Sequence, residues 1–288
     1  MVNGRPGTPQ NRFGGGSRLV SGMALRRLLR GRVPWDTIDG VVRELLDRYD
    51  EPSARVEFLD ADNWLSTPMA VDDRWFVKIV TEQNSLVHAL LTASRNLGAF
   101  SAGTPGFFEH FGTPYEMAAH ELDATQRMRE LGVNAPTPLE AFEYEGHGVL
   151  VLEFFPEFQS LGELPTEAIE AHAPTIFSFL RRMHDNGIAH GDFREENVLV
   201  ADGELYFIDA TSVRADAIDD ARSYDLACAI GTLEPLVGAR SAVNAAAEYY
   251  TPTELLGADE FLDFVNIRPD HDFDAATVKG EIEKHATL

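Results

Sequence analysis

The sequence of 288 residues has one cysteine, three lysines and no long apolar run. The single cysteine, Cys228, cannot form a disulfide within the chain, and one thiolate is too few for a zinc cluster of the zinc-finger type. No segment approaches the roughly 18 apolar residues of a membrane span, and the N-terminus lacks a secretory apolar region with a cleavage site. These absences exclude disulfide-rich and membrane-spanning proteins. We expect a cytoplasmic protein with no membrane partner.

Acidic residues outnumber basic ones by 47 to 24, and the formal net charge is −23. Such a surface disfavours nonspecific binding to DNA and to anionic membranes. Because so few of the basic residues are lysine, the composition is typical of proteins adapted to high salt, and we expect an origin in a halophilic archaeon. With 44% hydrophobic residues, the chain is long enough for one large domain or for two lobes with a real core.

Basic charge is concentrated at the N-terminus, where residues 1–35 contain seven arginines and no acidic residue. We predict that residues 1–34 form a basic, disordered tail. Contact with RNA or with a ribosomal partner is a second interpretation of this tail, and a start of translation at Met23 is a third.

Lys78 is the only lysine in the first 278 residues, where the other strongly basic side chains are arginines. It lies in the run DRWFVKIV, whose apolar and aromatic residues predict a strand. The alternation of a strand places Lys78 on the face opposite Trp75, Val77 and Ile79. A compact ammonium contacts phosphate oxygens as a point charge, and a planar guanidinium is a poor replacement for it. The pattern therefore indicates a phosphate ligand, with a lysine that only covers apolar surface as the alternative.

The segments around Lys78 predict a small lobe of five strands and one helix. A helix at about Tyr115–Leu131 follows from the spacing of its apolar residues and from Gly132 beyond its end. Between these two features, residues 81–115 form an insertion that acts as a lid, as a docking surface or only as packing. This order of elements is that of the small lobe of a protein kinase. The expected strands are residues 54–59, 64–71, 73–80, 135–145 and 148–155.

A kinase lobe requires a helix glutamate that holds the lysine over the phosphates of the nucleotide. Glu121, midway along the predicted helix, is our first choice for this residue, and Glu116 is the alternative. The segment VLVLEFF has the character of the hinge between two lobes. We therefore assign Glu153 to cofactor binding, together with Lys78 and Glu121.

The run HGDFREENVLV, residues 190–200, places Asp192 five residues before Asn197. This is the spacing of a kinase catalytic loop, in which the aspartate accepts or orients the proton of the nucleophile and the asparagine holds a metal ion. An amphipathic helix is expected before the loop, at about residues 167–184. Asp209 follows a strand-like run twelve residues after Asn197, where kinases place a second metal ligand. We predict that Asp192, Asn197 and Asp209 are the catalytic residues.

These motifs resemble those of the RIO family of atypical protein kinases. HGDFREENVLV and YFIDATSV are similar to that family's catalytic and metal loops, and the likeness extends over about residues 60–236. The resemblance implies an α+β, two-lobed protein-kinase-like fold, with a β-rich N-lobe at 35–155 and a mostly helical, truncated C-lobe at 156–288. It also implies an ATP-dependent phosphotransferase, either an atypical serine/threonine protein kinase or an ATPase, that uses ATP and Mg²⁺.

The same resemblance implies a role for each site residue. Lys78 would contact phosphates, Asp192 would be the catalytic aspartate, and Asn197 and Asp209 would hold magnesium. Some members of the family are ATPases whose metal-loop aspartate takes the phosphoryl group, so Asp209 has a second candidate role. The phosphoryl acceptor is a protein or a small molecule that the sequence does not identify.

Two departures from ordinary protein kinases keep other functions open. The loop LDADNWLSTPM between the first two strands has no glycine, so the backbone nest that cradles phosphate is missing. A nucleotide-binding pseudokinase scaffold is therefore one alternative. Asp225 follows Asp209 by only 16 residues, too few for a long activation segment and a peptide-docking platform. A small-molecule phosphotransferase is the other alternative.

Several polar positions have competing interpretations. Asp225 is either a buried helix aspartate that braces the catalytic loop or a helix N-cap. His184 and His190 are expected to brace backbone rather than to bind metal. The segment RPDHDFD, residues 268–274, has the composition of a metal loop, but in so acidic a chain we favour a solvated turn.

Overall fold

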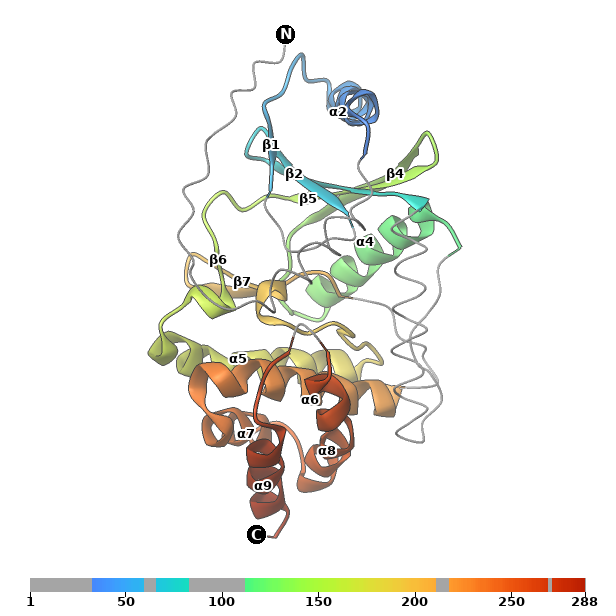
Figure 1. The fold of residues 1–288 in the computed structure, drawn as a ribbon. Coiled ribbons are helices and arrows are strands. Elements are labelled where there is room, and N and C mark those ends of the chain that lie inside the picture. The colour runs from blue at the N-terminus through green and yellow to red at the C-terminus, as the bar shows by residue number, and fades with distance from the viewer. Residues whose placement is uncertain (1–32, 60–65, 83–111, 211–217, 269–270, 288) are drawn as a thin grey trace, which may run out of the picture.

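Strand β3 lies at the centre of an antiparallel sheet with the order β1-β2-β3-β5-β4, which forms one of two lobes (Figure 1). The structure, a computed structural model, describes residues 33–59, 66–82, 112–210, 218–268 and 271–287. The elements of this first lobe are α2 (Trp35–Tyr49), β1 (Val56–Phe58), β2 (Thr67–Val71), β3 (Trp75–Val80), α4 (Pro114–Glu130), β4 (Pro138–Tyr144) and β5 (His147–Glu153).

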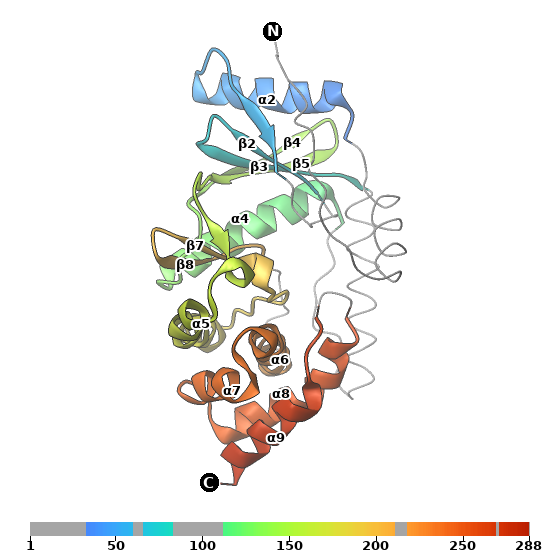
Figure 2. The same ribbon diagram turned by 60° about the vertical axis from the view of Figure 1, so that its left-hand side comes forward.

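Helices cover both faces of the sheet, with α2 on one side and α4 on the other (Figure 2). Trp75, Val77 and Ile79 of β3 belong to the same buried cluster as Leu45 of α2. Each of these side chains is almost fully removed from water, which stabilises the lobe by roughly 2 kcal/mol per residue. The alternation of the strand turns Lys78 to the opposite face, towards α4, as predicted.

Helix α4 begins with a capping box. Oγ1 of Thr113 accepts a hydrogen bond from the backbone N–H of Glu116 at 3.1 Å, and the Glu116 carboxylate accepts one from the N–H of Thr113 at 3.1 Å. The first turn of α4 packs against β5 at Gly148, where a Cβ would lie 2.1 Å from the carbonyl oxygen of Pro114. The predicted helix at about Tyr115–Leu131 is confirmed to within one residue at each end.

The second lobe combines a small sheet, ordered β6-β7-β8, with helices. Helix α6 is buried on nearly all sides because its sequence is almost entirely apolar from Leu226 to Leu233. Asp225 is a fully buried acidic residue on this helix. The elements are β6 (Gln159–Ser160), η1 (Leu161–Glu163), α5 (Thr166–Asp185), η2 (Glu195–Asn197), β7 (Val198–Ala201), β8 (Glu204–Phe207), α6 (Ile218–Val237), α7 (Ala239–Ala247), α8 (Pro252–Asn266) and α9 (Ala275–Ala286).

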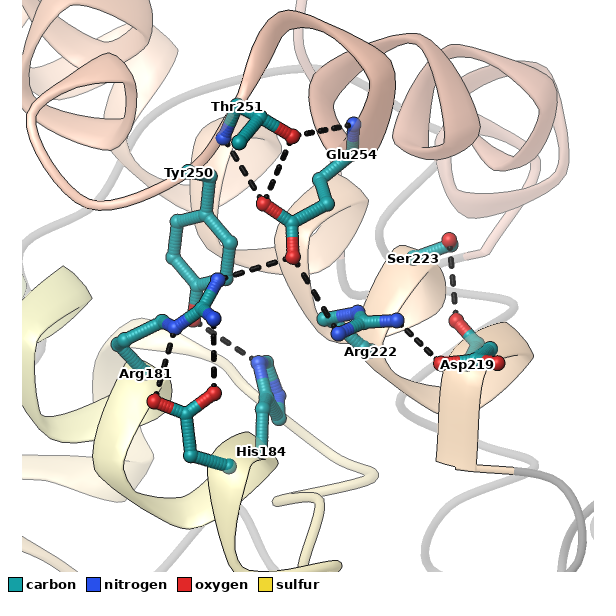
Figure 3. A network of polar contacts seen from close by, with 9 residues as sticks. Arg181, His184, Asp219, Arg222, Ser223, Tyr250, Thr251 and Glu254 are labelled. Atoms are coloured by element: carbon teal, nitrogen blue, oxygen red, sulfur yellow. Dashed lines mark hydrogen bonds and ion pairs between the residues drawn. The ribbon is translucent and has the colours of Figure 1, made fainter.

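An ion-pair network joins α5, α6 and α8 (Figure 3). Glu254 of α8 accepts a hydrogen bond from Arg181 of α5 at 2.9 Å and lies 3.3 Å from Arg222 of α6. The same carboxylate completes the capping box of α8 with Thr251. Burial would raise the pKa of Glu254, but the hydrogen bonds from Thr251 and Arg181 outweigh it and lower the pKa. This carboxylate therefore links α5, α6 and the start of α8.

The predicted fold class, α+β with two lobes, is confirmed, and the five strands and main helix of the first lobe occur in the predicted order. Among the described ranges, no helix is long and apolar enough to cross a membrane. Residues 1–32 of the predicted tail, residues 83–111 of the predicted insertion and residues 60–65 of the loop after β1 lie outside the described residues.

Candidate active site

Lys78 joins the two lobes at the centre of the candidate active site. Its Nζ lies 2.9 and 2.8 Å from the two carboxylate oxygens of Glu121 on α4, and 2.7 Å from Oδ1 of Asp209, just after β8. All three side chains are largely removed from water. Because charges attract more strongly away from water, this cluster holds β3, α4 and the end of β8 together.

The three charged groups shift one another's pKa values. Burial would lower the pKa of Lys78, but the carboxylates of Asp209 and Glu121 outweigh it and raise the pKa. Burial raises the pKa of Glu121 to about 8, because one ammonium does not compensate two buried carboxylates. Burial would also raise the pKa of Asp209, but Lys78 outweighs it and holds that pKa at about 2. Lys78 therefore stabilises the charged form of Asp209 more strongly than it stabilises that of Glu121.

Of the two glutamates considered as partners of the lysine, the structure places Glu121 beside it. The Glu116 carboxylate instead accepts hydrogen bonds from the backbone N–H groups of Gly112 and Thr113 at the start of α4. Five residues separate the two glutamates, so they lie on different sides of the helix. Helical periodicity therefore allows only one of them to face Lys78.

The backbone of the predicted catalytic loop is held by a buried carboxylate on α6. Asp225 accepts hydrogen bonds from the backbone N–H groups of His190 at 2.6 Å and Gly191 at 2.7 Å, and it lies 3.0 Å from Nε2 of His184. Because α6 begins at Ile218, the N-cap interpretation of Asp225 is wrong and the brace is confirmed. Gly191 has a φ of 77°, a left-handed value that glycine adopts without a steric penalty.

Asn197 and Asp209, the predicted metal ligands, lie on adjoining segments. Nδ2 of Asn197 donates to the backbone carbonyl of Asp192 at 2.8 Å, and the N–H of Ile208 donates to the carbonyl of Asn197 at 3.1 Å. The first bond orients the Asn197 amide and leaves Oδ1 as its acceptor atom for a ligand. Asp209 has a φ of 56°, which is uncommon outside glycine. The chain therefore turns sharply after β8, where the Asp209 carboxylate contacts Lys78.

These ligand types fit magnesium better than a resident zinc ion. The described part of the chain contains no cluster of three or more His, Cys, Asp or Glu side chains that could hold a metal. Mg²⁺ prefers oxygen ligands, keeps several waters and is commonly bound through one or two carboxylates together with substrate phosphates. The carboxylate of Asp209 and the amide oxygen of Asn197 are ligands of this kind. His184 and His190 instead contact Asp225, the first through its ring and the second through its backbone.

Asp192 lies between two arginines. Its Oδ1 accepts a hydrogen bond from Nη2 of Arg268 at 2.8 Å, and its Oδ2 lies 3.3 Å from Nε of Arg194. Arg194 belongs to the catalytic loop itself, whereas Arg268 comes from the turn after α8. The predicted catalytic aspartate is thus held from two sides by permanent positive charges.

The expectation that residues 268–274 form a solvated turn holds only in part: among the described residues of this segment, Asp272 and Asp274 are exposed, whereas the other side chains face the protein. Arg268 contacts the catalytic loop, and His271 and Phe273 are buried. The ring of Phe273 packs so closely on α6 that a Cβ at Gly231 would lie 2.7 Å from it. The acidic composition of this segment gave no indication of which side chains face the core. Arg268 was therefore not among the predicted site residues, and no spacing motif marks it.

Glu153, assigned to cofactor binding, lies at the end of β5 and pairs with β3. Its carboxylate accepts hydrogen bonds from the backbone N–H and the hydroxyl of Thr137, and its own N–H donates to the carbonyl of Thr137 at 2.9 Å. These contacts tie the end of β5 to the segment before β4. A role of Glu153 in cofactor binding stays a prediction.

Residues 112–223 match the family model described as the RIO domain. The likeness is to RIO kinases. The matched segment contains Glu121, Asp192, Asn197 and Asp209, whereas Lys78 precedes it.

Two curated proteins show a related similarity. Over 115 residues the chain is 28% identical to the KEOPS complex subunit Bud32 of Pyrococcus abyssi (strain GE5 / Orsay). The aligned region covers 38% of this chain and 51% of that protein. Over 93 residues it is 31% identical to the RIO-type serine/threonine-protein kinase Rio1 of Haloferax volcanii. This aligned region covers 31% of each chain. The similarity spans about half of the first relative and about a third of the second.

Aminoglycoside-3'-phosphotransferase of type VIII has a crystal structure whose backbone resembles that of this chain. The TM-score is 0.48 at 16% sequence identity, and the alignment covers 79% of this chain and 98% of that one. Similarity at this level does not indicate a function.

Proposed function

We propose that this protein is a RIO-like atypical kinase or ATPase that binds Mg-ATP and transfers or hydrolyses the γ-phosphoryl group. The observation that carries the proposal is the contact of Lys78 with both Glu121 and Asp209. In protein kinases a strand lysine pairs with a helix glutamate, an aspartate of the metal loop holds Mg²⁺, and these groups together place the nucleotide phosphates. The match of residues 112–223 to the RIO domain supports the same function.

We infer a role for each of these residues from its position. Lys78 binds phosphate oxygens, and Glu121 holds its ammonium in place. Asn197 and Asp209 would hold Mg²⁺, which neutralises the charge of the phosphates when it is bound. Asp192 orients the attacking hydroxyl or water and accepts its proton. In an ATPase, the carboxylate of Asp209 is the candidate for taking the phosphoryl group itself.

A small-molecule acceptor is the second candidate, and one observation favours it. Only residues 211–217 connect Ala210 to the start of α6, which leaves little chain for an activation segment and a peptide-docking platform. A protein acceptor remains the first candidate because the relative Rio1 is named a serine/threonine-protein kinase. A pseudokinase scaffold would bind the nucleotide without turnover.

The test is ATP turnover by the purified protein with magnesium in multimolar KCl, with nucleotide binding followed in parallel. We expect turnover to fall about 100-fold or more in Asp192→Asn and Asp209→Asn, because each removes a charge that acts on the reacting groups. Asp202→Asn is a matched control: Asp202 is exposed in the turn after β7 and, like Asp209, has a left-handed φ. Because asparagine tolerates a left-handed φ, Asp202→Asn and Asp209→Asn carry the same backbone strain.

The outcomes separate the candidate functions. Turnover that is lost in both site variants and kept in the control supports an enzyme. Nucleotide binding without turnover in the wild type identifies a scaffold. Turnover that none of the three variants alters would exclude Asp192 and Asp209 from the chemistry. Adding either a protein or a small-molecule acceptor to the active enzyme then distinguishes the two kinase candidates.

A further inference from the structure

Arg268 reaches the catalytic loop from a distant part of the chain. It follows α8, and its Nη2 donates to Oδ1 of Asp192 at 2.8 Å. Its Nη1 donates to the hydroxyl of Tyr224 and lies 3.8 Å from Sγ of Cys228, both on α6. One guanidinium therefore connects the end of α8, the centre of α6 and the predicted catalytic aspartate.

Arg268 is anchored on the side away from Asp192. Its side chain is only 9% exposed, and Tyr224 and Cys228 are fully buried. Its backbone N–H donates to the carbonyl of Val265 at 3.0 Å, and its carbonyl accepts from the N–H of His271 at 3.2 Å. A side chain that blocks a site and leaves when substrate arrives needs an exposed path and few partners of its own. The anchoring of Arg268 instead indicates a fixed component of the site.

We propose that Arg268 is a positioning residue that holds the carboxylate of Asp192 in the orientation required for phosphoryl transfer. The inference rests on the proposed function, because it assigns a role within that reaction. Two neighbouring residues of α6 then support the catalytic loop at two levels. Asp225 fixes the backbone through His190 and Gly191, and Tyr224 fixes the Asp192 side chain through Arg268.

Orientation is the property that this contact controls. With Oδ1 held by Arg268, the rotation of the Asp192 carboxylate is set, and Oδ2 is directed to the side of Arg194. Misplacement of a reacting group by about 1 Å costs on the order of 100-fold in rate. Arg268 lies outside residues 112–223, which match the RIO domain. The part of the chain that follows the matched domain therefore contributes to the site.

Steady-state kinetics of Arg268→Met, Arg268→Lys and the control Arg240→Met test the proposal. Arg240 lies on α7 with a side chain that is 75% exposed. We expect kcat of Arg268→Met to fall about 10- to 100-fold with an unchanged KM for Mg-ATP, because orientation and not nucleotide binding is lost. Arg268→Lys retains the positive charge but not the two-point contact of the guanidinium. Its kcat should therefore lie between that of Arg268→Met and that of the wild type. Arg240→Met should match the wild type.

Chemical rescue separates positioning from a purely structural role. Guanidinium ion, added well below denaturing concentrations, should restore part of the kcat of Arg268→Ala and none of that of Asp192→Asn. A wild-type kcat in Arg268→Met, or a loss of kcat that only follows lowered thermal stability and is not rescued, would overturn the proposal.

A second measurement does not depend on turnover. In a crystal structure of Arg268→Met, we expect the Asp192 carboxylate to be rotated or disordered while the contacts of Asp225 with His190 and Gly191 are kept. An unmoved Asp192 carboxylate would overturn the positioning role. If the wild type shows no turnover that depends on Asp192, the proposed function fails, and this crystal structure still decides whether Arg268 positions the carboxylate.

Discussion

Lys78 of β3 and Glu121 of α4 form an ion pair in which the ammonium lies 2.9 and 2.8 Å from the two carboxylate oxygens. Protein kinases need this pair for activity, and many control it by moving the helix. In this protein the start of α4 is fixed by its capping box and by the close contact of Pro114 with Gly148. These contacts hold the start of the helix that carries Glu121 against the sheet that carries Lys78.

Exchanging Glu121 and Glu116 separately for glutamine should separate the pairing role from the capping role. Glu121→Gln replaces one of the two oxygens that contact Lys78 with an amide N–H₂, which cannot accept from the ammonium, and we expect kcat/KM for ATP to fall about 10- to 100-fold. Glu116→Gln should leave kcat/KM almost unchanged, because glutamine also completes a capping box. Steady-state kinetics of both variants provide the measurement. A larger loss in Glu116→Gln would contradict the pairing seen in the structure.

The raised pKa of Glu121 predicts that the folded protein loses stability as the pH rises. A carboxyl group whose pKa is about 8 in the folded protein and near 4.5 in the unfolded chain favours folding fully below about pH 4.5. That contribution is lost as the pH rises through about 8. Asp209 acts in the opposite sense, because its pKa is lowered to about 2 and its contribution is lost only in acid.

Thermal unfolding between about pH 5 and pH 9 measures this effect. The Tm of the wild type should fall across this range relative to that of Glu121→Gln, which has no carboxyl group to titrate at this position. Parallel curves for the two proteins would show that Glu121 does not titrate with a raised pKa. Repeating the comparison with Glu116→Gln controls for the loss of one acidic residue from α4.

The sequence predicted those features that depend on local patterns. The alternation in DRWFVKIV correctly assigned Trp75 and Lys78 to opposite faces of β3. The spacing of Asp192 and Asn197 correctly placed them on one loop, where the Asn197 side chain contacts the Asp192 carbonyl. Such patterns report on neighbours in sequence, and the stereochemistry of strands and tight loops converts them directly into neighbours in space.

Contacts between distant segments could not be predicted in this way. Arg268 lies 76 residues from Asp192, and nothing in RPDHDFD distinguishes it from an exposed arginine. Its position depends on how α8 packs against α6 and on where the turn after α8 directs the side chain. The alternatives for Asp225 were likewise separated only by the start of α6, because a buried acceptor and an N-cap have the same residue type.

Removing the charge of Asp225 should destabilise the second lobe and the catalytic loop together. In Asp225→Asn, an amide N–H₂ replaces either Oδ2, which contacts His190 and His184, or Oδ1, which accepts from Gly191. Because buried donors then lose their acceptor, we expect a loss of about 3 kcal/mol in the free energy of unfolding, with reduced turnover.

Urea denaturation, with turnover assayed in parallel, measures both consequences for Asp225. Asp220→Asn, on the first turn of the same helix, is the control. Burial beside Asp219 raises the pKa of Asp220, so loss of its charge should have little effect on stability. Equal stability of the two variants would mean that Asp225 does not brace the loop.

A methyl group at Gly148 should separate β5 from α4 and so disturb the Lys78–Glu121 pair. The added Cβ would lie 2.1 Å from the carbonyl oxygen of Pro114, which is backbone and cannot rotate away. We expect Gly148→Ala to lose about 3 kcal/mol of stability. Its kcat/KM for ATP should also fall, because Glu121 moves with α4.

Gly280→Ala is the control for this substitution. A Cβ on this glycine of α9 meets nothing within 4 Å, and alanine favours the helix by about 1 kcal/mol relative to glycine. Denaturation and turnover of both variants test the expectation, and a Gly148→Ala protein with wild-type stability and turnover would show that β5 does not hold α4 in place.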